Sequence, residues 1–139
     1  MKKILILMMS LSVILASCGA RGSKSNEEKE TKIEADATDG LVRLYSFHTN
    51  KRCITCRAIE KLTKEVVAEM ANDKIRLEVI NISEKKNEEI VEKYEVTWSS
   101  LIADNGKRND LTKMGFSYAK NQPEMFKTKL KEELTKMLK

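Results

Sequence analysis

Two cysteines separated by two residues, Cys53 and Cys56, stand where a strand pattern gives way to a helix pattern. Residues 41–47 are apolar and aromatic enough for a buried strand. From Cys56 onward, apolar residues recur at the spacing of one helix face, at Ile59, Leu62, Val66, Val67 and Met70. We therefore expect the pair on the first turn of a helix that follows a buried strand, the context in which this spacing indicates redox chemistry.

The first turn of a helix favours a reactive thiolate at Cys53. Only the thiolate attacks a disulfide, and the free N–H groups and positive dipole end of a helix stabilise that anion. Lys51, Arg52 and Arg57 add positive charge nearby. Cys56 begins the apolar stripe, so it should be less exposed and should resolve a mixed disulfide formed at Cys53.

Two structural interpretations of the pair are weaker. A structural zinc site needs about four ligands, and Cys53, Cys56 and the single histidine, His48, supply three at most. A purely stabilising disulfide would close a very small loop, which constrains the unfolded chain little.

The first 17 residues have the pattern of a signal peptide. Two lysines precede an almost wholly apolar run over residues 4–15, too short to span a bilayer comfortably. The run ends in Leu15-Ala16-Ser17-Cys18-Gly19, which resembles the bacterial lipobox. The resemblance implies cleavage before Cys18 and lipid on that cysteine, which leaves Cys53 and Cys56 to pair with each other.

Residues 18–40 are expected to be a lipidated N-terminus and flexible tether, because this polar segment cannot bury a core. Residues 41–139 have the length of one small domain. The formal charge of +5 falls to +3 when the two lysines of the signal segment are removed. The charges are spread along the chain without any nucleic-acid-binding module, so no nucleic-acid partner is expected.

The remaining domain reads as an alternation of helices and strands. Residues 75–82 alternate as a strand, residues 85–94 have a helical face, and Pro123 suits the first turn of a helix reaching about Leu138. Asn105-Gly106 predicts a hairpin between strands at 100–103 and 108–112. The segment 114–119 is ambiguous.

This order resembles that of the thioredoxin-like superfamily, with Cys53-Ile54-Thr55-Cys56 in the place of its active-site motif. The resemblance implies an α/β fold with a mixed sheet of about four strands flanked by three helices. The lipoprotein signal together with Phe47-His48-Thr49 ahead of the cysteines also resembles the ArsF-like proteins. That small bacterial family is named for arsenic-resistance gene clusters and a nitroaromatic reductase.

The chain departs from thioredoxins at two positions. Thioredoxins have a cis-proline before the third strand, facing the cysteines and discouraging metal binding, and Ser99 occupies that position here. Trp98 beside it is expected to form a wall of the substrate groove. Thioredoxins also have a buried acid in the first strand, which this chain lacks. His48 is the titratable candidate for a base nearby, with a strand-end histidine of no catalytic duty as the alternative.

These features predict a lipid-anchored thiol–disulfide oxidoreductase of the bacterial cell envelope, facing the periplasm or the exterior. Cys53 would attack and Cys56 resolve, with no cofactor besides their disulfide and with protein thiols or disulfides as partners. The alternative is a binder of soft metals or metalloids, such as Cu(I) or arsenite, through Cys53, Cys56 and His48. A redox-inert adaptor that holds a partner beside Trp98 is a third possibility. The oligomeric state is left open.

Overall fold

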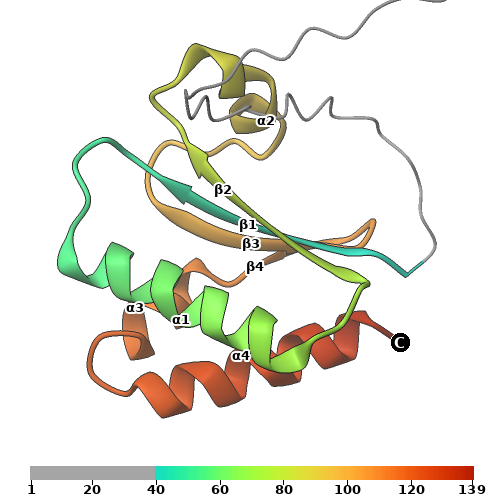
Figure 1. The fold of residues 1–139 in the computed structure, drawn as a ribbon. Coiled ribbons are helices and arrows are strands. Elements are labelled where there is room, and N and C mark those ends of the chain that lie inside the picture. Colours follow the sequence, from blue (N-terminus) through green and yellow to red (C-terminus); the bar gives the residue numbers. More distant parts are fainter. Residues whose placement is uncertain (1–39) are drawn as a thin grey trace, which may run out of the picture. The chain divides into compact units, whose positions relative to one another are not determined.

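The computed structural model describes residues 40–139, which form a four-stranded sheet with helices on both faces (Figure 1). The strands are β1 (Val42–His48), β2 (Ile75–Asn81), β3 (Ser100–Asp104) and β4 (Arg108–Asp110). The helices are α1 (Ile54–Met70), α2 (Glu88–Lys93), α3 (Thr112–Tyr118) and α4 (Pro123–Met137), and the 3₁₀ turn η1 (Lys85–Asn87) precedes α2. The expected signal segment, Cys18 and residues 18–39 of the tether lie outside the described residues.

The sheet has the strand order β2-β1-β3-β4. β1 runs parallel to β2 and antiparallel to β3, and β4 returns antiparallel to β3. A mixed sheet in this order, with α1 crossing between the two parallel strands, confirms the expected thioredoxin-like α/β fold. No helix in the described part of the chain is long and apolar enough to cross a membrane.

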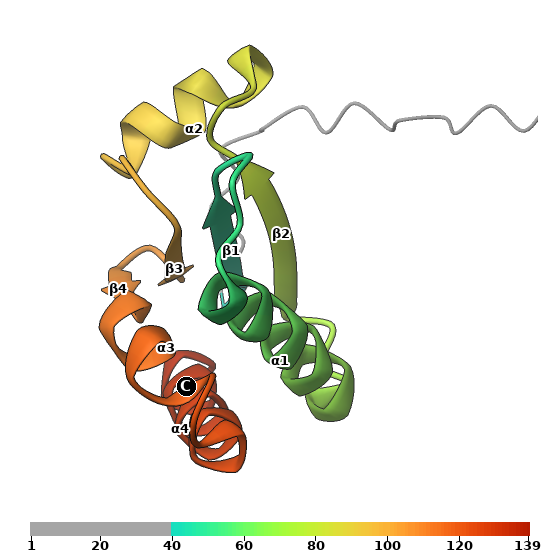
Figure 2. The ribbon, with the colours of Figure 1, turned by 90° about the vertical axis from the view of Figure 1, so that its left-hand side faces the viewer.

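Alternate residues of β1 pack into two hydrophobic cores, one on each face of the sheet. Val42 and Leu44 pack with residues of α1, α3 and α4, whereas Tyr45 and Phe47 pack with α2 on the opposite face. Figures 1 and 2 show the resulting layers, with three helices below the sheet and α2 above it. Because both faces of β1 are buried, its apolar and aromatic residues do not simply alternate with polar ones.

The predicted hairpin is confirmed, and the structure adds a fourth α-helix to the three that were expected. Gly106 adopts φ +96° in the turn between β3 and β4, a conformation that glycine tolerates best. The ambiguous segment is α3, which begins at Thr112. The Thr112 Oγ1 accepts a hydrogen bond from the Leu101 N–H at 3.0 Å. A helix of seven residues is marginal alone, so its packing against the sheet and α1 stabilises it.

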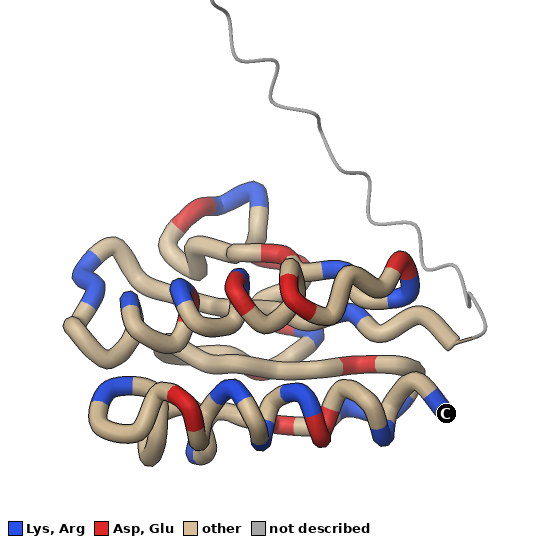
Figure 3. Tube along the Cα trace, turned by 60° about the horizontal axis from the view of Figure 1, so that its bottom comes forward, with Lys and Arg blue, Asp and Glu red and all other residues tan. Residues whose placement is uncertain are grey.

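Charged residues of both signs are interspersed along the helices (Figure 3). Lys127 of α4 pairs with Glu65 at 2.6 Å and with Glu69 at 3.2 Å, which links α4 to α1. The hydrogen bonds that Lys127 donates to these carboxylates raise its pKa to about 12. The mixture of signs agrees with a solvated surface rather than a polyanion-binding one.

Candidate active site

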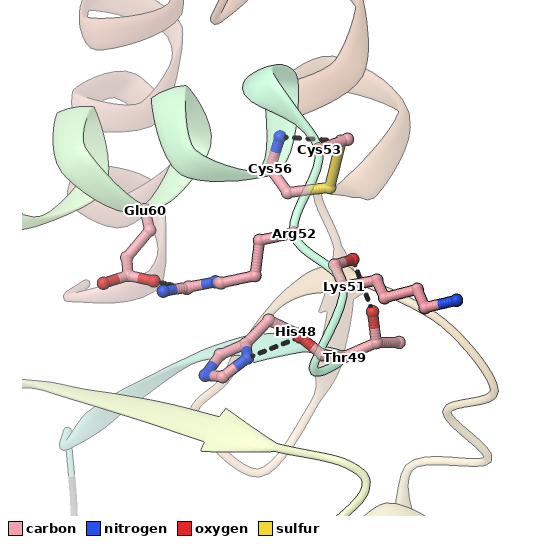
Figure 4. The surroundings of a disulfide bond; sticks show 7 residues. All are labelled: His48, Thr49, Lys51, Arg52, Cys53, Cys56 and Glu60. Carbon is pink, nitrogen blue, oxygen red and sulfur yellow. Dashed lines mark hydrogen bonds and ion pairs between the residues drawn. A yellow bond between two sulfur atoms is a disulfide. The ribbon is translucent and has the colours of Figure 1, made fainter.

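The two cysteines form a disulfide at the start of α1 (Figure 4). Their Cα atoms are 5.1 Å apart. Cys53 is the N-cap residue, with the extended backbone typical of that position, and its Sγ accepts a hydrogen bond from the Cys56 N–H at 3.1 Å. Cys53 is exposed and Cys56 is half-buried. The first cysteine is therefore the one that a partner molecule can reach.

The sulfur of Cys53 takes the place of the oxygen that usually caps a helix. When the disulfide is reduced, a thiolate at this position meets the unpaired N–H groups of the first turn and the positive end of the helix dipole. Both effects favour the anion over the neutral thiol. No acidic residue lies in the first turn of α1 to oppose them. The exposure and the capping geometry thus identify Cys53 as the candidate nucleophile.

The basic residues ahead of the cysteines do not converge on the disulfide. Arg52 Nη2 forms an ion pair with Glu60 Oε2 of α1, and Lys64 Nζ lies 2.6 Å from the other oxygen of the same carboxylate. Lys51 extends away from both sulfur atoms (Figure 4). The positive charge expected at Cys53 from Arg52 is therefore offset by Glu60, a residue that no sequence signal connects with the site.

Hydrogen bonds hold the loop between β1 and α1 from several sides. Asn81 at the end of β2 donates from Nδ2 to Asn50 Oδ1 at 2.8 Å, and the Ile82 N–H donates to the His48 carbonyl at 2.9 Å. Within the loop, Thr49 Oγ1 donates to the Lys51 carbonyl at 2.8 Å. These contacts, together with the Arg52–Glu60 pair, hold the loop in place and so determine the position of Cys53.

His48 lies at the end of β1, and no hydrogen bond found in residues 40–139 joins it to either cysteine. Its Nδ1 lies 3.1 Å from the Thr49 carbonyl. Because a carbonyl only accepts, Nδ1 is the donor in this contact. Figure 4 shows the ring separated from the disulfide. The described residues contain no group of three or more His, Cys, Asp or Glu side chains placed to hold a metal ion.

A small pocket lies beside Cys56. It has a volume of about 10 Å³, roughly that needed to hold one water. Its lining combines the end of β1, the start of α1, the segment before β3 and α3: Ser46, Phe47, His48, Cys56, Ile59, Ser99, Ser100 and Phe116. Ser99 therefore lies close to the half-buried cysteine. Ser46 of β1, which also lines this pocket, is buried.

A larger groove opens next to that pocket and shares Ser100 and Phe116 with it. The groove has a volume of about 590 Å³. The Trp98 ring forms one wall, is 56% exposed, and stacks on Phe116 of α3 with 5.4 Å between the ring centroids. The remaining lining is polar, from Asp110, Thr112, Lys113 and Ser117. Trp98 is a groove wall, as the sequence predicts. Phe116 could not be predicted as part of the groove, because its segment has no clear secondary-structure pattern.

Comparison with solved structures finds thioredoxins and similar chains. The chain is similar to a thioredoxin from Fasciola hepatica, with 20% identity and a TM-score of 0.47 over 71% of this chain and 83% of that one. It is also similar to Trxlp from Edwardsiella tarda EIB202, with 18% identity and a TM-score of 0.49 over 70% and 85% of the two chains. A malarial protein aligns with 19% identity and a TM-score of 0.42 over 64% and 96%. No protein-family model and no curated protein matches the chain.

Proposed function

We propose that this protein is a lipid-anchored thiol–disulfide oxidoreductase that acts on protein thiols or disulfides outside the cytoplasm. The observation that carries the proposal is the Cys53–Cys56 disulfide at the N-terminus of α1, with one sulfur exposed and capping the helix. An exposed, lone disulfide next to a groove is suited to exchange rather than to stabilising the fold.

The proposed exchange begins with the reduced pair. The Cys53 thiolate attacks one sulfur of a substrate disulfide, and the other substrate sulfur leaves as a thiolate. Cys56 then loses its proton and attacks the Cys53 sulfur of this mixed disulfide, which releases the second substrate thiol. The substrate disulfide gains two electrons and two protons, and the Cys53–Cys56 disulfide forms again. The same steps in reverse oxidise a substrate dithiol.

The groove beside Trp98 is the proposed docking position for the segment that carries the substrate cysteine. An exposed aromatic wall can bury apolar substrate surface. Ser100 borders both the groove and the small pocket beside Cys56, and Ser99 borders that pocket. A serine at residue 99 replaces the proline that the thioredoxin resemblance leads one to expect. The backbone there retains an N–H group that proline lacks, and it is available for contact with an extended substrate chain.

A trapping experiment tests the exchange. In Cys56→Ser protein, the mixed disulfide at Cys53 cannot be resolved, so partners should accumulate as covalent adducts that dithiothreitol releases. Cys53→Ser protein keeps the same number of thiols but loses the exposed nucleophile, and it should trap nothing. Equal trapping by the two variants, or none by either, would contradict the proposed roles of the cysteines.

The lipid anchor has a separate test. Cys18→Ala should abolish acylation, so that the protein no longer fractionates with membranes in high salt and the lipid-dependent increase in mass disappears. Cys18→Ala does not alter Cys53 or Cys56, so redox exchange in detergent-free extracts should persist. Recovery of the variant with an unchanged lipid-modified mass would show that Cys18 is not the anchor.

A further inference from the structure

Glu60 carries a carboxylate on the same side of α1 as the cysteines. It follows Cys56 by four residues and Cys53 by seven, which places it one and two helical turns away. Its side chain is only 13% exposed, and that of its partner Arg52 is 27% exposed. Apart from their ion pair, Glu60 Oε2 and Arg52 Nε make no hydrogen bond. Removing charges from water in this way is costly, and the cost is recovered in full only when further hydrogen bonds satisfy the charged groups. Stability alone therefore does not account for this pair.

The pair connects the residue immediately before Cys53 with the body of α1. Figure 4 shows the Arg52 side chain extended along the helix toward Glu60, away from the disulfide. A guanidinium one residue from Cys53 would stabilise its thiolate if it were free to approach it. In this structure, the carboxylate both holds the guanidinium and offsets its charge.

We propose that Glu60 is a positioning residue that sets the redox equilibrium of the cysteine pair by holding Arg52 away from Cys53. The inference rests on the proposed exchange at Cys53 and Cys56, and it adds the regulation of the potential of that site. A pair whose reduced thiolate is stabilised becomes the stronger oxidant. Glu60 therefore keeps the disulfide less oxidising than it would be if the Arg52 guanidinium could approach Cys53.

The size of the effect follows from the geometry of the helix. Seven residues correspond to about 10 Å along the axis. A unit charge at that distance, at an effective dielectric constant of about 20, changes an equilibrium constant by roughly tenfold. Tenfold corresponds to about 30 mV for this two-electron couple.

The experiment measures the equilibrium of the full-length protein with glutathione: the disulfide and two glutathione molecules on one side, the dithiol and oxidised glutathione on the other. The fraction reduced is read by thiol trapping and intact mass. Glu60→Gln should shift the equilibrium about tenfold toward the dithiol, or about 30 mV. Arg52→Gln leaves the carboxylate and should shift it toward the disulfide.

The opposite signs separate electrostatics from loosening of the loop, because a merely structural clamp would give both variants a shift in the same direction. Glu69→Gln is the matched control. Glu69 is another carboxylate of α1 that pairs with lysines, Lys127 and Lys131, but its distance from Cys53 along the helix axis is about 24 Å. By the same arithmetic, Glu69→Gln should change the equilibrium by at most about threefold, and by less than that because salt screens the exposed Glu69 charge.

Shifts of the same sign in both variants, or a Glu60→Gln shift no larger than that of Glu69→Gln, would overturn the inference. If Glu60→Gln does not fold, Arg52→Gln decides alone, because a shift toward the dithiol contradicts the proposal. The glutathione equilibrium needs no protein substrate. Wild-type protein that equilibrates with glutathione but traps no protein would thus refute the proposed function while still testing Glu60.

Discussion

Gly115 is the point at which α3 meets α1, and replacing it tests whether α3 shapes the site. A Cβ at residue 115 would lie 3.1 Å from Ile59 Cδ1 and 3.3 Å from Ile59 Cγ1. Ile59 is buried and also lines the pocket beside Cys56. Gly115→Val would force two further methyl groups into this contact, and overpacking of that kind costs about 1–3 kcal/mol. The better helix propensity of valine, compared with glycine, offsets this cost by less than about 0.5 kcal/mol.

We therefore expect Gly115→Val to lower the free energy of unfolding by about 1–3 kcal/mol. Urea unfolding followed by circular dichroism measures this loss as a lower midpoint with an unchanged slope. Displacement of α3 should also expose Cys56, which alkylation of the reduced protein would detect as faster labelling.

Ser117→Val is the control, because Ser117 is an exposed residue of the same helix and should change stability by no more than about 0.5 kcal/mol. Equal stability of Gly115→Val and the wild type, or an equal loss in Ser117→Val, would refute the close approach of α3 to α1.

Three further predictions concern the cysteines, the segment before β3 and a buried hydroxyl. In reduced protein at neutral pH, iodoacetamide should label Cys53 well before Cys56 in peptide mass maps, and equal rates would remove the case for an activated nucleophile. Ser99→Pro should raise the turnover of a model disulfide and weaken Cu(I) binding by the reduced pair; no change in either would show that Ser99 is not opposite the cysteines. Tyr94→Phe removes the 2.6 Å hydrogen bond to Asp104 and should cost about 1.5–3 kcal/mol in urea unfolding. Because burial raises the pKa of Tyr94, the wild type should lose stability faster than this variant as the pH rises above about 10, where the unfolded tyrosine ionises.

Much of the fold could be predicted because its signals are local. The apolar run of β1, the helical spacing after Cys56 and the Asn105-Gly106 turn each depend on residues that are neighbours in the chain. α3 had no such signal. Its seven residues include Gly115, which is unfavourable in a helix by itself and becomes favourable only because Ile59 needs the space.

The same division holds for the site. The sequence by itself determined that Cys53 begins a helix and that Cys56 follows on its inner side. The spacing of the apolar residues changes from that of a strand to that of a helix at these cysteines, and this change can be seen in the sequence alone. Only the tertiary structure decided that Phe116 stacks on Trp98 and that Arg52 turns from Cys53 to Glu60. The reason is physical: a charged or aromatic side chain has several possible partners within reach along the chain, and the packing of distant elements selects among them.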